Sequence, residues 1–219
     1  MLLCYITDRS QFSGDEPARR RCLLEKITEA ARYGVDFIQL REKDLSTREL
    51  ELLARQAICA VREISQSATQ LLINSRTDVA LAIGAEGVHL RSDDISPADV
   101  RKTLNHHGRG PCDRFAIGVS CHSIHEVRQA VDHADFVVFG PISKKKGTSE
   151  RGAVGIEALH QACREKIPVL ALGGITVENA VACVQAGAAG IAGIRVFQEN
   201  EIGRVVDALR SLPRLDVVD

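Results

Sequence analysis

The stretch "FIQLREKD", residues 37–44, passes directly from an apolar run into four charged residues, and the longer segment "RELELLARQAICAVREI" follows from Arg48. The apolar run is typical of a strand that is buried on both faces. The longer segment carries apolar residues at three-to-four spacing, which indicates an amphipathic helix. A strand that leads into a helix is the repeating unit of parallel α/β folds, so this stretch predicts a βα unit with charges at the strand's carboxyl end.

The same unit recurs along the chain. Eight β-rich runs precede helix-length amphipathic segments: "LLCYIT" at 2, "DFIQL" at 36, "QLLIN" at 70, "GVHL" at 87, "FAIGVS" at 115, "DFVVFG" at 135, "PVLALGG" at 168 and "GIAGI" at 190. Eight units give roughly 27 residues each, which favours a single-domain (β/α)8 barrel over residues 1–219. A doubly wound open sheet is the alternative, because the strand pattern alone does not exclude it.

The composition indicates an α/β protein without a strong overall charge. Hydrophobic residues make up 45% of the 219 residues, enough for one substantial core. The 28 Lys and Arg nearly balance the 29 Asp and Glu, so no global field favours nucleic acid or an anionic membrane. An anionic ligand must therefore be met by a local cluster of cations.

The cysteines and the apolar runs indicate a cytoplasmic protein. Seven cysteines occur without CxxC spacing, which favours reduced thiols over a disulfide framework or a zinc site. The start "MLLCYITDRS" lacks the features of a signal peptide, and no apolar run approaches the ~18 residues that span a bilayer. The sequence leaves the oligomeric state open, a homo-oligomer included.

Polar residues follow the predicted strands, where a barrel places its catalytic face. Gln39 should point inward, and Arg41 and Lys43, two residues apart, should project to the same side at the barrel mouth. Arg and Lys at this face favour a phosphorylated small-molecule substrate. The other strand-end candidates are Thr7, Asp8, Asn74, Ser75, His89, Asp93, Asp94, Ser120, Cys121, His122, Lys144, Lys145, Lys146, Gly173, Gly174 and Arg195.

Three of these groups each allow two interpretations. Gly173 and Gly174 are either a phosphate cradle before a helix that begins near Val177, with Arg195 adding charge, or a tight turn. The loop "SKKKGTSERG" from Ser143 is either a solvated surface loop or a lid that closes on a pyrophosphate. Asp93 and Asp94 either hold Mg²⁺ or precede a helix.

The run Ser120, Cys121, His122 is a weak candidate for a nucleophile and its base, because neighbours on an extended strand point to opposite faces. No third residue that would orient the histidine is evident. His89, within "GVHL", is predicted to be a core histidine with satisfied hydrogen bonds rather than a ligand.

Several segments together resemble the thiamine phosphate synthase and TenI superfamily, whose members are (β/α)8 barrels. They are "YITDR", "DFIQLREKD", "LLINSRTDVALAIGAEGVHLRSDDIS", "IGVSCHS", "VVFGPI" and "VLALGGITVENAVACVQAGAAGIAGI", and they cover residues 5 to about 198. The resemblance implies coupling of hydroxymethylpyrimidine pyrophosphate to thiazole phosphate with release of pyrophosphate. It also implies Mg²⁺ as the cofactor.

The resemblance carries roles to matching positions. Gln39, Arg41 and Lys43 correspond to residues that hold the pyrimidine pyrophosphate, Asn74 and Ser120 to further substrate contacts, and Gly173 and Gly174 to the thiazole phosphate site. Asp94 corresponds to a metal ligand that Asp93 would assist, whereas Lys145, Lys146 and Arg195 would add charge to the bound phosphates. We predict catalytic roles for Arg41, Lys43, Ser120 and His122.

The chain departs from the synthase pattern at three places. Ser75 stands where the family has a second metal-binding aspartate, "SKKKGTSERG" replaces a Thr-x-Thr-Lys segment, and Arg195 replaces a serine. Two alternatives follow: a TenI-type thiazole tautomerase, for which His122 would carry the proton, and a catalytically silent relative that binds thiazole phosphate. Pro141 stands where the tautomerases have a histidine, and the intact "QLREK" favours the synthase.

Overall fold

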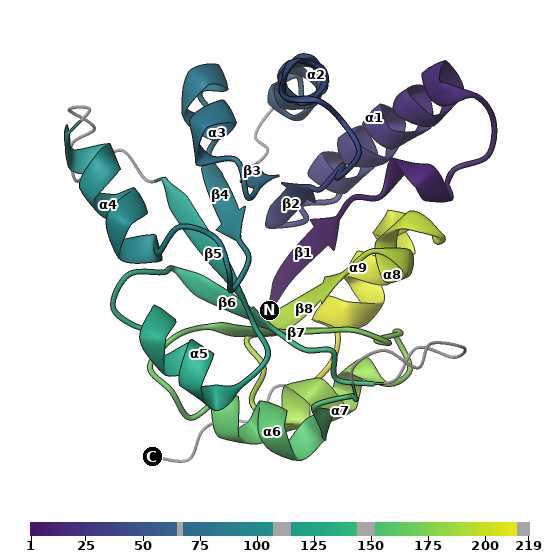
Figure 1. The fold of residues 1–219 in the computed structure, drawn as a ribbon. Helices are drawn as coiled ribbons and strands as arrows, with labels where there is room; N and C mark the ends of the chain where they lie inside the picture. The colour runs from purple at the N-terminus through teal and green to yellow at the C-terminus, as the bar shows by residue number, and fades with distance from the viewer. Residues whose placement is uncertain (65–67, 107–114, 144–151, 214–219) are drawn as a thin grey trace.

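The computed structural model describes residues 1–64, 68–106, 115–143 and 152–213. Eight parallel strands form a closed barrel in sequence order (Figure 1). The strands are β1 (Leu2–Ile6), β2 (Phe37–Leu40), β3 (Gln70–Asn74), β4 (Gly87–Leu90), β5 (Ala116–Cys121), β6 (Phe136–Phe139), β7 (Val169–Leu172) and β8 (Gly190–Gly193). Because β8 pairs with β1, the barrel prediction is confirmed and the open sheet is excluded.

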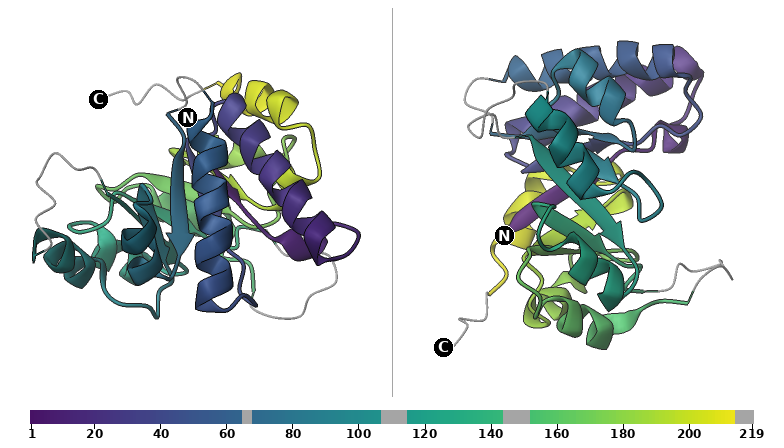
Figure 2. Two further views of the ribbon diagram at one scale, coloured as in Figure 1. Left: turned by 90° about the horizontal axis from the view of Figure 1, so that it is seen from above. Right: turned by 60° about the vertical axis from the view of Figure 1, so that its left-hand side comes forward.

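Helices surround the barrel on its outside, as the two views of Figure 2 show together with Figure 1. They are η1 (Arg9–Gln11), α1 (Glu16–Arg32), α2 (Thr47–Arg62), α3 (Thr77–Ile83), α4 (Pro97–His106), α5 (Ile124–Ala130), α6 (Gly155–Ala162), α7 (Ala180–Gln185), α8 (Arg195–Gln198) and α9 (Ile202–Arg210). Over the described part of the chain, no helix combines the length and apolarity that a membrane crossing requires.

The strand alternation divides the core into two clusters. Every second strand residue points into the barrel, where Cys4, Ile6, Leu72, Ala116, Phe136, Val138, Leu170 and Ala192 pack together. The residues of opposite parity pack against the helices in a larger cluster. Gln39 and His89 share the inward parity and are buried, at 2% and 1% exposure. Residues that continue this parity past the strand ends therefore stand at the barrel mouth.

The turn after β2 is fixed by the start of α2. Ser46 caps the helix and accepts from the Glu49 amide, while the Glu49 carboxylate accepts from the Ser46 amide, which makes a complete capping box. The apolar face of α2 then packs on the sheet through Leu50, Leu53, Ala54, Ala57, Ile58 and Val61. Strand and helix thus leave only residues 41–46 to connect them.

Candidate active site

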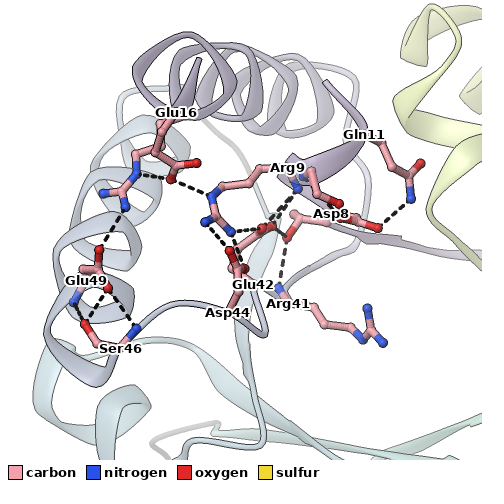
Figure 3. A network of polar contacts seen from close by, with 12 residues as sticks. Asp8, Arg9, Gln11, Glu16, Arg41, Glu42, Asp44, Ser46 and Glu49 are labelled. Atoms are coloured by element: carbon pink, nitrogen blue, oxygen red, sulfur yellow. Dashed lines mark hydrogen bonds and ion pairs between the residues drawn. The ribbon is translucent and has the colours of Figure 1, made fainter. Parts of the chain in front are cut away.

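In the segment "REKD", the Arg41 side chain points away from those of Glu42 and Asp44, which turn toward Arg9 (Figure 3). Arg41 is half-buried and Lys43 exposed, and among the described residues neither forms an ion pair. Glu42, between them, is buried and faces the loop after β1. The alternation of an extended chain therefore sends the two cations to the mouth and the acid into the protein.

Glu42 belongs to a buried ion-pair network centred on Arg9, a residue that is only 4% exposed. Arg9 Nη1 lies 3.0 Å from Glu42 Oε2, and Arg9 also binds both carboxylate oxygens of Asp44 at 2.7 Å. Its Nε donates to Glu16 at the start of α1 (Figure 3). The network ties the segment after β2 to the segment after β1 and to α1.

The Thr7 hydroxyl also links the segment after β1 to the segment after β2. Thr7 donates its hydroxyl proton to Glu42 Oε1 at 2.6 Å and accepts from the Arg41 amide at 2.9 Å. Burial raises the pKa of Glu42, opposed by its hydrogen bonds from Thr7 and Arg9 and by the charge of Arg9. The ionisation of the Glu42 carboxyl group therefore depends on Arg9. The hydrogen bond from the Arg41 amide to Thr7 fixes the backbone that carries Arg41 before any ligand binds.

The mouth beside β2 is strongly cationic. The pKa of Lys43 is lowered, first by Arg41, then by partial burial and by Arg91. The pKa of Arg41 is lowered mainly by burial and further by Arg91, against the attraction of Asp8 and Glu42. Like charges held together favour an incoming anion, as the sequence predicted for Arg41 and Lys43. The sequence did not point to Arg91.

Gln39 and Asn74 meet inside the mouth. Gln39 Nε2 donates to Asn74 Oδ1 at 3.0 Å, and Asn74 Nδ2 donates to Ser75 Oγ at 3.1 Å. Ser75 has a φ of 62°, a left-handed conformation that is uncommon outside glycine and asparagine or aspartate. Backbone strain of this kind is often found at functional sites, so the functional role predicted for Asn74 beside it stays a prediction.

The histidine partner of Ser120 is His89 rather than His122. His89 Nε2 lies 2.9 Å from Ser120 Oγ across the β4 and β5 pairing, and Gly118, without a Cβ, leaves room for the ring. His89 is buried, as predicted. Its Nδ1, however, is buried without a hydrogen-bond partner among the described residues, so the prediction of satisfied hydrogen bonds was wrong.

Burial lowers the pKa of His89 from 6.5 to about 3, with a further contribution from Arg41. The ring is therefore neutral at physiological pH. A buried acceptor lone pair without a partner costs less than a buried N–H without one, which favours the tautomer with the proton on Nε2. That proton is donated to Ser120 Oγ, and the serine hydroxyl is left free to donate toward the mouth.

The free energy of unfolding is expected to fall as the pH decreases from 6.5 toward 3, because the unfolded chain protonates His89 first. The expected contribution is about 1.4 kcal/mol per pH unit within this window. Urea unfolding at pH 7, 6 and 5 for the wild type and His89→Gln measures it. Equal pH slopes for the two proteins would show that His89 remains protonatable in the folded state.

His122 stands on the same side of the chain as Ser120 and lines a cavity beside β7 and β8, whereas Cys121 is buried on the other side. Its Nδ1 lies 2.5 Å from the Gly140 carbonyl, which can only accept, so Nδ1 carries the proton. Nε2 remains as the second ring nitrogen. The separation of Ser120 from Cys121 agrees with the strand argument against a nucleophile and base among these neighbours.

The cavity of about 1000 Å³ lies over β7 and β8 and includes Gly173, Gly174 and Arg195. The glycines have φ values of 99° and 65°, and a Cβ on Gly174 would come within 2.8 Å of Ser143 Cβ. The backbone therefore needs glycine to approach the loop after β6. Helix α7 begins at Ala180, later than expected, because residues 176–179 form a turn.

Asp93 and Asp94 follow β4, as predicted, and both are engaged by Arg91. Arg91 Nη2 donates to Asp93 at 2.8 Å, and Asp94 accepts from the Arg91 amide at 2.7 Å, with Arg91 Nε at 3.5 Å. No group of three His, Cys, Asp or Glu side chains in the described ranges could hold a metal. Lys144, Lys145 and Lys146 lie outside the described residues.

Comparison with known proteins identifies the family to which the chain belongs. The family model described as "Thiamine monophosphate synthase" matches residues 3–197, which is most of the chain. The chain belongs to the thiamine monophosphate synthase family. The resemblance inferred from the sequence is thereby confirmed.

Named relatives extend this match over nearly the whole barrel. The thiamine-phosphate synthase of Chlorobium luteolum is 38% identical over 216 residues, covering 96% of this chain and 91% of the relative. That of Moorella thermoacetica is 36% identical over 193 residues, covering 85% and 83%. The solved thiamine phosphate pyrophosphorylase of Pyrococcus furiosus superposes with a TM-score of 0.75 at 28% identity, covering 96% and 94%. These matches support the enzyme class, a thiamine phosphate synthase.

Proposed function

We propose that the protein couples hydroxymethylpyrimidine pyrophosphate to thiazole phosphate, releasing pyrophosphate and forming thiamine phosphate. The observation that carries the proposal is a pair of cations, Arg41 and Lys43, held at the mouth of an apolar barrel without an ion-pair partner among the described residues. Such a pair is suited to a pyrophosphate, which a fixed guanidinium can bind through two oxygens.

The two phosphorylated substrates would occupy different parts of the mouth. The cations follow β2, whereas the cavity with Gly173, Gly174 and Arg195 lies over β7 and β8, which are three and two strands away around the ring. A thiazole phosphate seated in this cavity would present its ring toward the barrel axis. The separation lets each anionic group have its own site while the reacting atoms meet between them.

The proposed reaction needs little from the protein besides charge and exclusion of water. The pyrimidine methylene loses pyrophosphate to give a stabilised cation, and the thiazole nitrogen then captures this cation. Arg41 and Lys43 would stabilise the negative charge that develops on the departing pyrophosphate. The barrel floor is apolar, with Phe37 and Phe136 stacked at 4.5 Å between ring centroids, which keeps water from competing for the cation.

Ser120 and His89 would orient the leaving group. The neutral His89 ring fixes Ser120 Oγ at 2.9 Å, and the free hydroxyl proton can be donated to a pyrophosphate oxygen. Gln39 and Asn74, hydrogen-bonded to each other, are placed to contact the pyrimidine end of the substrate. None of these residues has to act as a nucleophile.

The donor set after β4 fits Mg²⁺ only with help from the substrate. Asp94 and Asp93 would hold the ion, since Mg²⁺ is commonly bound by one or two carboxylates together with phosphate oxygens. Ser75 supplies no charge at the position of the family's second aspartate. When bound, the ion would supply positive charge to the leaving pyrophosphate.

Purified protein is expected to form thiamine phosphate from the two substrates with Mg²⁺ and to lose this activity in excess chelator. In Asp94→Ala, the Mg²⁺ concentration for half-maximal activity should rise about 10–100-fold because a ligand carboxylate is lost. The matched control is Asp132→Ala, an exposed carboxylate before β6 at the opposite end of the barrel. An unchanged Mg²⁺ dependence in Asp94→Ala would show that the metal binds elsewhere.

One observation favours a second candidate, a thiazole tautomerase. His122 donates from Nδ1 to Gly140 O and lines the cavity, which leaves Nε2 as a proton acceptor there. That activity would survive chelation and fall in His122→Ala. No turnover of either substrate set, with saturable thiazole phosphate binding, would indicate the catalytically silent relative.

A further inference from the structure

Arg91 stands at the barrel mouth, although it is not among the site residues predicted from the sequence. It follows β4 directly and shares the inward parity of His89, as Arg41 shares that of Gln39 after β2. Its side chain is 53% exposed, so a ligand can reach the guanidinium. Arg91 thus occupies, after β4, the place that Arg41 occupies after β2.

Arg91 interacts with both kinds of charge at this mouth. Its guanidinium lies 2.8 Å from Asp93 Oδ2 and 3.5 Å from Asp94 Oδ1. On the other side, β2 and β4 both neighbour β3, so Arg91 and Arg41 follow strands that lie close together in the ring, and the charge of Arg91 lowers the pKa of both Arg41 and Lys43. The Asp94 side chain, at 14% exposure, is much less accessible than that of Asp93, at 71%. The guanidinium thus pairs closely with Asp93 and more loosely with the less accessible Asp94, which also accepts from the Arg91 amide at 2.7 Å.

We propose that Arg91 is a further pyrophosphate-binding residue that exchanges partners, neutralising Asp93 and Asp94 in the empty site and binding the pyrophosphate group in the filled one. This inference rests on the proposed function. The exchange is accessible because exposed ion pairs are weak, whereas a guanidinium binds phosphate through charge-assisted and often bidentate hydrogen bonds. The same movement would remove the positive charge from both carboxylates, while Asp94 keeps its hydrogen bond from the Arg91 amide.

The exchange makes metal and anion binding depend on each other. In the empty site Arg91 and a divalent cation compete for the Asp94 carboxylate, so the cation binds weakly. Once pyrophosphate draws Arg91 away, Asp94 becomes available. By linkage, pyrophosphate must then raise the affinity for the cation by the same factor as the cation raises the affinity for pyrophosphate.

Arg91→Gln separates these effects by direct binding measurements on the whole protein. Inorganic pyrophosphate is titrated calorimetrically in chelator, and Mn²⁺, as a probe for Mg²⁺, is titrated by electron paramagnetic resonance without pyrophosphate. The variant should bind pyrophosphate about tenfold more weakly, as expected for one lost charge-assisted contact. It should bind Mn²⁺ more tightly than the wild type, so the two affinities should change in opposite directions.

Arg128→Gln is the matched control, because Arg128 is also exposed and paired with a carboxylate, Glu165 at 2.9 Å, but lies on α5 outside the barrel. It should change neither affinity. If Arg91→Gln binds pyrophosphate with the same affinity as the wild type, the proposed role of Arg91 is overturned, but the proposed function is not. Weaker pyrophosphate binding without tighter Mn²⁺ binding would overturn the exchange. Absence of pyrophosphate binding by the wild type, both in chelator and with Mg²⁺ present, would refute the proposed function as well.

Discussion

Arg41→Ala is expected to lower kcat/KM for thiamine phosphate formation by about 10²–10³-fold, the usual effect of removing one preorganised contact to developing charge. Arg41 is held by its own backbone, since its amide donates to Thr7 Oγ1, and its guanidinium is left without an ion pair among the described residues. The measurement is the steady-state rate at varied pyrimidine pyrophosphate and saturating thiazole phosphate. A loss below about threefold would remove Arg41 from the pyrophosphate site.

Stability distinguishes this functional loss from misfolding. Arg41 is disfavoured where it stands, because burial and the nearby Arg91 both lower its pKa. Arg41→Ala should therefore leave the midpoint of urea unfolding unchanged or raise it slightly. Arg41→Lys should recover only part of the activity, since an ammonium keeps the charge but not the planar fork. Arg55→Ala, an exposed arginine of α2 paired with Glu51, is the control and should be silent.

Arg9→Met is expected to lower the free energy of unfolding by about 3–5 kcal/mol, because it leaves a carboxylate buried without its cation. The Glu42 side chain is 2% exposed, and the guanidinium 3.0 Å away supplies the positive charge that, with the hydrogen bond from Thr7, favours its ionised form. Urea unfolding followed by circular dichroism measures the loss. Activity should fall with it, since the same network fixes the segment that carries Arg41 and Lys43.

The double variant Arg9→Met/Glu42→Gln tests the cause of that loss. If the penalty comes from an unpaired buried charge, neutralising Glu42 should restore a large part of the stability, whereas additive losses are expected if the two residues act independently. Arg20→Met is a matched control. Arg20 also binds Glu16, at 2.7 Å, but its side chain is 27% exposed. A loss below about 1 kcal/mol in Arg9→Met would place the network among ordinary surface ion pairs.

The sequence by itself determined the eight βα units and the residues at their strand ends, and it favoured the barrel, whose closure the pairing of β8 with β1 then decided. Eight buried strand patterns alternating with amphipathic segments predict the fold, and the two-residue spacing of Arg41 and Lys43 predicts that both face the mouth. These are local properties, because the periodicity of a strand or helix depends on neighbouring residues only. The motifs "QLREKD", "GVHL" and "GGIT" were also sufficient to indicate the family.

Only the tertiary structure decided which of these residues act on one another. His89 meets Ser120 from 31 positions away, and Arg9 meets Glu42 from 33 and Asp44 from 35. Arg91 comes to face Arg41 and Lys43 only because β2 and β4 flank β3 in the closed barrel. The register of neighbouring strands sets these encounters. For this reason the sequence did not indicate Arg91 or the Arg9 network. It predicted satisfied hydrogen bonds for His89, whereas Nδ1 has no partner among the described residues.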